Sequence, residues 1–213
     1  MSSGPSSKGP KGSKSANPRR TELMAIFCLA AWLTGTVCVA FVATQNFYTI
    51  DRLLKSSPSP PFRSAVNTLD SVETPGHPTA RDLLRYLSAE LNRLYFQYWN
   101  AAQILVGILT LWLVGKLPGV SRVKWCVVGM LGVSIFLMVV LTPPIISVGR
   151  TLDFVPREPP PPEVTAALRK FGLLHVTYTV MTLINLILGV LSTIWIQKPQ
   201  ISRPELKVVE IAR

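Results

Sequence analysis

The sequence predicts an all-α membrane protein, a four-transmembrane-helix bundle whose first and second spans carry helical extensions on the outer side. Charged residues make up only 15% of the 213 residues and hydrophobic residues 48%, whereas roughly 25% of an ordinary soluble chain is charged. Four stretches contain no Asp, Glu, Lys or Arg: residues 23–45, 94–114, 125–149 and 171–197. Each exceeds the roughly 17–20 residues that a helix needs to cross about 30 Å of hydrocarbon. A soluble globular domain and a disordered chain are therefore both excluded.

The domain organisation follows from where these stretches lie. Residues 1–20 contain basic side chains but no acidic or aromatic one, and such a segment buries too little apolar surface to become ordered, so we expect a disordered basic cytoplasmic arm. A cleaved signal peptide is the alternative, but the apolar run of about 22 residues is too long for one, and a retained signal anchor fits better. The transmembrane domain is expected at residues 21–198, and a cytoplasmic tail at residues 199–213. The four spans of the transmembrane domain are expected at residues 23–45, 94–115, 125–147 and 171–197.

The distribution of basic residues predicts the orientation of the bundle. The connector between the second and third spans contains Lys116, Arg122 and Lys124 and no acidic residue, and short cytoplasmic loops carry such an excess. With an even number of spans, both termini are then cytoplasmic, and the expected location is a bacterial inner membrane. We attribute the net charge of +11 to topology and to attraction to anionic lipid. The expected partner is thus the lipid bilayer and not nucleic acid.

Helix signals extend the first two spans beyond the bilayer. The first span is expected to continue past Asn46 through Leu54. For the second, Thr79 is a suitable N-cap with Asp82 at the third helical position, and apolar residues recur after it at helical spacing. These signals predict one helix of about 35 residues that projects about two and a half turns beyond the membrane. An interfacial amphipathic helix that breaks at Trp99–Asn100 is the alternative.

Prolines separate the predicted helices. Of the 18 prolines, only Pro143 and Pro144 lie within a span, near its outer end. Proline removes a helical hydrogen bond and its ring clashes with the preceding turn, so it is expected outside helices. The other prolines fall in the arm, the tail and the predicted connections, which include a loop at residues 56–79 and the proline run at residues 159–162.

Polar and small side chains recur every three or four residues along the predicted spans. Unsatisfied polar groups cost several kcal/mol in lipid, so these side chains are expected to face the bundle interior. Hydrogen bonding between helices is the commoner role of such stripes. In the fourth span the stripe is His175, Thr179, Thr182, Asn185, Gly189 and Ser192. The polar residues expected in the bundle interior are Gln45, Asn46, Asn100, Gln103, Thr182 and Asn185.

His175 is the one His, Asp, Glu, Lys or Arg side chain within a predicted span. Ionisable residues inside the membrane are functional candidates by default, and three roles stay open for it: a hydrogen bond to another helix, ligation of haem or a metal, or proton relay. Since His77 is the other histidine of the chain, a multi-histidine metal site is not expected. No cofactor is predicted, with haem or another tetrapyrrole at His175 as the alternative.

No motif for catalysis is present. The chain lacks the GxSxG, P-loop, HExxH and GxGxxG patterns and therefore the nucleophile, phosphate and metal sites that they build. Cys28, Cys38 and Cys126 all lie in apolar spans without a CxxC spacing, which favours packing residues over a disulfide or zinc framework. No catalytic residue is predicted.

Several residues occur in the order found in one family of membrane proteins. They are Ala31-Trp32-x-x-Gly35, the runs at residues 41–47 and 93–98, Pro143, and Phe171-Gly172-x-x-His175 followed by Asn185 and Gly189. Over residues 23–196 the chain resembles the transmembrane protein 205-like domain, a four-helix membrane domain of unknown function. The resemblance implies a four-helix architecture and no established biochemistry.

Three hypotheses of function follow. The lack of a catalytic constellation favours a non-enzymatic protein, an interaction or accessory subunit that packs against a larger membrane complex or against itself. The first alternative is a tetrapyrrole- or metal-binding bundle that uses His175. The second is a small-solute permease or resistance factor, although four spans without a repeat or a broken helix are unusual for a transporter.

Overall fold

The described part of the chain consists of helices that run along one another. The structure, a computed structural model, describes residues 18–72, 77–155 and 161–198, and these residues contain no β-strand. Four helical segments are long and apolar enough to cross a membrane: α1, Pro18–Ser56; α3, Ala80–Gly115; the continuous segment Ser121–Thr151; and α6, Pro162–Gln197. The predicted four-helix membrane bundle is confirmed, and the chain is an integral, multi-pass membrane protein.

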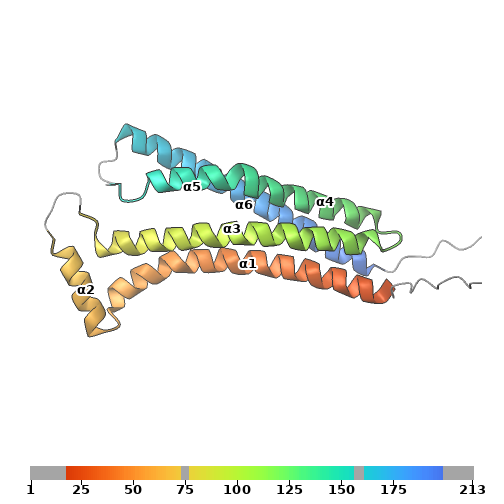
Figure 1. Cartoon of the computed structure of the whole chain (residues 1–213), viewed down its shortest axis with the longest axis horizontal. Helices are drawn as coiled ribbons and strands as arrows, with labels where there is room; N and C mark the ends of the chain where they lie inside the picture. The colour runs from red at the N-terminus through yellow and green to blue at the C-terminus, as the bar shows by residue number, and fades with distance from the viewer. Residues whose placement is uncertain (1–17, 73–76, 156–160, 199–213) are drawn as a thin grey trace, which may run out of the picture.

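The four segments pack side by side in one bundle. α1 lies along α3, the third segment packs against α3 and α6, and α6 also contacts α1 (Figure 1). α1 begins and α6 ends at the same end of the bundle, which we name the termini end. The short helix α2, Pro60–Asp70, lies at the opposite end, which we name the α2 end (Figure 1).

The first two long helices extend as the sequence predicts. α1 runs without interruption to Ser56, so its continuation past Asn46 is confirmed. α3 is a single helix of 36 residues, and the alternative with a break at Trp99–Asn100 is wrong. A reciprocal capping box starts α3, because Thr79 Oγ1 accepts from the Asp82 amide at 3.2 Å while Asp82 Oδ2 accepts from the Thr79 amide at 3.1 Å.

The loop expected at residues 56–79 contains a helix instead. α2 begins where Ser59 acts as N-cap, its hydroxyl accepting from the Phe62 amide at 3.4 Å. Pro60 and Pro61 occupy the first turn, where the missing amide hydrogen costs nothing and the fixed φ suits a helix. The prolines that suggested a loop therefore start a helix.

The third and fourth segments also extend at the α2 end. The sequence had predicted extensions only for the first and second spans. α5, Thr142–Thr151, carries the third segment past its expected end at residue 147. α6 begins at Pro162, nine residues before its expected start at residue 171. Again proline stands in the first turn, with Glu163 beside it, where a negative charge favours a helix N-terminus.

The third segment changes its winding at one place. α4, Ser121–Phe136, passes into a π-helix, η1, Leu137–Leu141, and then into α5. The Thr142 amide donates to the Leu137 carbonyl, five residues back. Pro143 and Pro144 have no amide hydrogen, so the regular helical pattern cannot continue through them. π-Helical turns are rare and often occur at functional sites.

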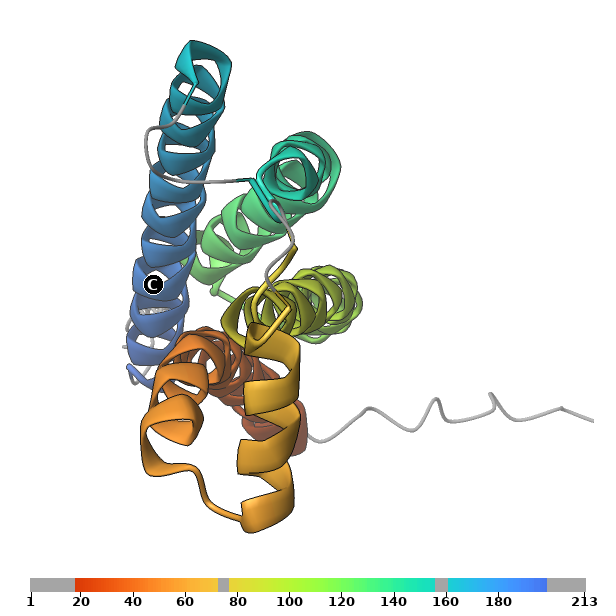
Figure 2. The same cartoon turned by 90° about the vertical axis from the view of Figure 1, so that its left-hand side faces the viewer.

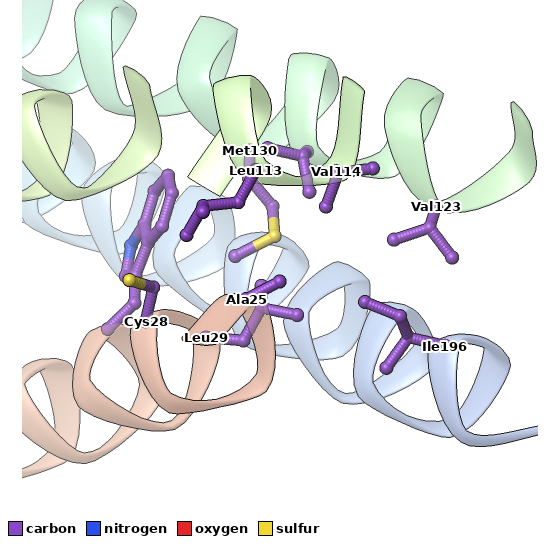
Figure 3. Packing of buried hydrophobic residues seen from close by; sticks show 10 residues of the cluster. Ala25, Cys28, Leu29, Leu113, Val114, Val123, Met130 and Ile196 are labelled. Carbon is purple, nitrogen blue, oxygen red and sulfur yellow. The ribbon is translucent and has the colours of Figure 1, made fainter. Parts of the chain in front are cut away.

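The hydrophobic core lies in the half of the bundle nearer the termini end. Ten buried side chains from α1, α3, α4 and α6 meet there (Figure 3). They are Ala25, Cys28, Leu29, Trp32, Leu113, Val114, Val123, Val127, Met130 and Ile196. Gly189 lets α6 approach α1, because a Cβ atom at this position would lie 2.6 Å from Cδ2 of Leu33. The four segments are thus tightly packed at this end.

Candidate binding pocket at the α2 end

The helices separate toward the α2 end and leave a pocket of about 640 Å³ between α1, α3, α5 and α6. Seen from that end, α6 begins away from α1 and approaches it toward its C-terminal end (Figure 2). Apolar side chains form most of the wall, including Val37, Ala40, Phe41, Ile145, Leu183 and Leu186. The polar side chains that line it include Asn92, Arg93, Gln103, Thr142, His175, Tyr178 and Thr182.

A buried polar cluster joins α3, α4 and α6 at the floor of the pocket, its end nearest the core. Ser134 Oγ donates to Gln103 Oε1 at 2.8 Å. Asn185 Nδ2 donates to Ser134 Oγ at 3.1 Å and more weakly to Gln103 Oε1 at 3.5 Å. The three residues are at most 4% exposed, and Asn185 Oδ1 has no partner among the described residues. These hydrogen bonds hold the three helices together where lipid supplies no alternative partner.

A second cluster, around Asn100, holds α3 against η1, α5 and α6. Asn100 Nδ2 donates to Thr142 Oγ1 at 2.9 Å, and the Tyr178 hydroxyl donates to Asn100 Oδ1 at 2.9 Å. Thr142 Oγ1 in turn donates to the Leu137 carbonyl at 2.8 Å. The π-helical turn is therefore tied through one hydroxyl to the α3 amide, and Asn100 is fully buried.

Amide and indole groups connect α1 to α3 along the other side of the pocket. Asn46 Nδ2 donates to Asn92 Oδ1 at 2.7 Å, and Asn92 Nδ2 donates to the Ala43 carbonyl at 3.0 Å. Trp99 Nε1 donates to Thr36 Oγ1 at 3.3 Å. α1 and α3 consequently form a fixed pair, whereas α6 is separated from α1 on the pocket side.

An ion cluster lies at the rim of the pocket, toward the α2 end. Arg93 binds Asp153 through two hydrogen bonds of 3.0 and 3.1 Å and also contacts Glu90 at 2.5 Å. Arg150 lies 3.3 Å from Glu90. Two guanidinium groups and two carboxylates balance each other, so the cluster carries no net charge. The Arg93 and Asp153 side chains are only 12% and 16% exposed.

His175 lies on the wall of the pocket, and its side chain is exposed. Its ring centroid is 4.4 Å from that of Phe171. In the described part of the chain no group of three or more His, Cys, Asp or Glu side chains is placed to hold a metal ion. Arg93, which lies on the same pocket, is already paired with two carboxylates and so is not free to bind haem propionates. The residues present do not fit a haem group.

The residues that were predicted to form the polar interior of the bundle differ in how deeply they are buried. Asn100, Gln103 and Asn185 are buried between helices. Asn46 is half-buried against Asn92, and Thr182 is half-buried on the pocket with its hydroxyl donating to the Tyr178 carbonyl. Gln45 is exposed, which corrects its expected interior position. The next residue of α1, Asn46, is the one that faces α3, through its hydrogen bond to Asn92.

Sequence reasoning missed several residues of these clusters. Ser134 and Thr142 are polar side chains within an apolar span, a signal that was available for the third segment as for the fourth. Tyr178 lies one residue before the stripe position Thr179, and its hydroxyl reaches α3 because its ring spans the extra distance. The pairing of Arg93 with Asp153 joins residues sixty positions apart and left no local pattern.

Comparison with models of known protein families, with curated proteins and with solved structures finds no match to this chain. The structural class of this protein is therefore described from its fold and its pocket alone. It is a four-helix integral membrane protein that is packed tightly at the termini end and contains a largely apolar pocket at the α2 end.

Proposed function

We propose that this chain is a non-enzymatic membrane protein of a bacterial inner membrane, an accessory subunit that contacts a partner protein through α2. In this proposal both termini are cytoplasmic and the α2 end faces outward, as the basic connector at Lys116–Lys124 favours. The observation that carries the proposal is that α2 is a well-formed helix that buries none of its residues.

The sequence of α2 has one apolar face. Phe62, Val66 and Leu69 are spaced by four and three residues, which places them on the same side of the helix. Leu69 is 37% exposed, and the other two are half-buried. A helix of 11 residues is marginal in water unless its apolar face packs against something. Within the described chain α2 makes only slight contact with α3. We therefore infer that the apolar face of α2 packs against a partner protein.

The bilayer is a poor candidate for covering this face. α1 continues through Ser56, eleven residues beyond the end of its uncharged stretch at Gln45, which corresponds to about 16 Å of helix. Asp51, Arg52 and Lys55 lie on this extension. We therefore infer that α2 lies outside the hydrocarbon of the bilayer. There, its apolar face can be buried against a protein surface but not against lipid chains.

A pair of α2 variants tests this proposal. The triple variant Phe62→Ser, Val66→Ser, Leu69→Ser is expected to lose a partner that co-purifies with the wild type in mild detergent, because serine removes the apolar contact area. The matched control, Arg63→Ala with Asn67→Ala, changes two exposed residues of the same helix that lie outside the apolar face and is expected to keep the partner. Light scattering during size exclusion, with mass spectrometry of each peak, provides the readout.

Two outcomes contradict the proposal. One is a wild-type protein that is monomeric and free of other polypeptides after gentle extraction from its native membrane. The other is a partner that stays bound to the serine variant as well as to the control, which would place the interface elsewhere.

The two alternative functions receive less support. The fit of haem is poor, as described above. For a permease, a continuous path is needed, but the pocket ends near Gln103 and Leu186, and the core with Trp32 and Met130 fills the other half of the described bundle. The resemblance to the transmembrane protein 205-like domain fits this four-helix architecture, and we retain membership of that family as part of the proposal.

A further inference from the structure

We propose that the pocket binds a single-chain amphiphile with an uncharged, oxygen-bearing head, a carbonyl or hydroxyl compound such as a prenyl quinone, which it takes from the adjoining bilayer leaflet. This site is independent of the α2 contact proposed above. At about 640 Å³ the pocket lies within the range of roughly 300–1,000 Å³ typical of small-molecule sites, and its apolar walls with a few polar groups are also typical.

The floor of the pocket offers an unused hydrogen-bonding group. Gln103 is 3% exposed and lines the pocket. Its Oε1 accepts from Ser134 and Asn185, whereas no hydrogen bond in the described part of the chain uses its Nε2. An amide N–H in a membrane interior is costly without a partner, and a ligand oxygen would supply that partner. A hydroxyl head fits as well, because its oxygen accepts a hydrogen bond from an amide N–H.

The charges around the pocket favour an uncharged head. Arg93 is the one Asp, Glu, Lys or Arg side chain among the described lining residues. It lies at the rim, and its guanidinium is bound by Asp153 and Glu90. A carboxylate or phosphate at the floor would be a buried charge without a counter-ion, which is strongly unfavourable. The floor of the pocket therefore disfavours the head group of an anionic lipid.

The shape of the pocket favours one chain that enters from the side. α1 and α5 make no contact in the described structure, and α6 diverges from α1 on this side (Figure 2). The lining residues Val37, Phe41 and Leu183 are 57%, 63% and 52% exposed, so the wall between α1 and α6 opens toward lipid. A ligand whose head group binds Gln103 and whose chain leaves the pocket between α1 and α6 would use both the free amide N–H and this opening. A phospholipid would bring only an acyl chain to the floor and would leave the amide without a partner.

Binding of three probes with matched ten-carbon chains tests this inference. The full-length protein is reconstituted in phosphatidylcholine nanodiscs and titrated with decylubiquinone, with quenching of tryptophan fluorescence as readout, because Trp99 lines the pocket. We expect saturable quenching that decanol reverses. Decanoate is expected to compete about tenfold less well or worse, since its carboxylate must lose its charge or remain outside.

Variants connect this signal to the pocket. Ala40→Phe fills the pocket from the α1 wall without removing a side chain that makes a hydrogen bond and is expected to abolish saturable quenching, whereas the control Ala30→Phe, at an exposed position of α1 outside the pocket, is expected to leave it unchanged. Gln103→Leu is expected to weaken binding about fivefold through loss of one hydrogen bond. If Gln103→Leu fails to fold, the Ala40→Phe and Ala30→Phe pair still decides the question.

Each of the following outcomes overturns the inference. Equal competition by decanoate and decanol would show that the head is not selected as proposed. Equal binding to wild type and Ala40→Phe would place the probe elsewhere. Quenching that never saturates, with only phospholipid recovered from the purified protein, would show that the pocket holds bulk lipid chains. A partner helix cross-linked between α1 and α6 would show that the pocket is a protein interface.

Discussion

Replacing Gly107 with leucine is expected to lower the stability of the bundle by about 3 kcal/mol, the upper end of the usual cost of overpacking. A Cβ atom at this position would lie 2.8 Å from both Leu131 Cδ1 and Trp32 Cη2. Trp32 is 1% exposed in the hydrophobic core, so its ring has no space into which to move. The measurement is the thermal midpoint of the detergent-solubilised protein, followed by size exclusion after heating.

Gly132→Leu is the matched control for this substitution. It introduces the same side chain into the third segment, where a Cβ atom meets nothing within 4 Å. We expect its thermal midpoint to stay close to that of the wild type. Equal midpoints for the two variants would show that α1 and α3 do not pack at Gly107 as described.

Replacing Arg93 with methionine is expected to cost about 3 kcal/mol of stability, as is usual when one partner of a largely buried ion pair is removed. Methionine leaves the Asp153 carboxylate, whose side chain is 16% exposed, without its bidentate partner, while Glu90 retains only Arg150. Chemical denaturation of the wild type, Arg93→Met, Asp153→Asn and the double variant gives the coupling energy of the pair.

Arg81→Met provides the comparison for an exposed pair. Arg81 lies 2.8 Å from Asp51, but the two side chains are 52% and 40% exposed, and such pairs are worth at most about 1 kcal/mol. We expect this variant to remain within that range. A loss at Arg93 as small as that at Arg81 would mean that Arg93 is solvated and does not join α3 to the chain after α5.

Much of the fold could be predicted because its causes are local. Uncharged stretches of sufficient length identify the four spans, and Thr79 with Asp82 identifies the start of α3 about four turns before its uncharged stretch. The prolines were harder to interpret, since the same residue ends one helix and starts another. This ambiguity hid α2 at Pro60 and the early start of α6 at Pro162.

The pocket could be predicted only in part, because it depends on how the helices diverge. The helical stripe containing Asn185 predicted a polar face on α6, but the sequence does not show that Gln103 would meet this face on the floor of a cavity. Gln45 and Asn46 were both expected in the interior, but successive residues of a helix are rotated by about 100° from each other, and hydropathy does not show which of the two faces α3. Asn92 decides it by accepting a hydrogen bond from Asn46.

The account depends most on the long helical segments crossing the bilayer, which cysteine labelling tests directly for α3 and the third segment. In a protein with Cys28, Cys38 and Cys126 replaced by alanine, single cysteines are placed at Ser64 in α2 and at the two ends of the third segment, Ser121 and Thr151, all of which are exposed. Intact cells are treated with a membrane-impermeant maleimide. We predict labelling at 64 and 151 before lysis and at 121 only afterwards. Labelling of all three positions from the same side would contradict the four-span bundle.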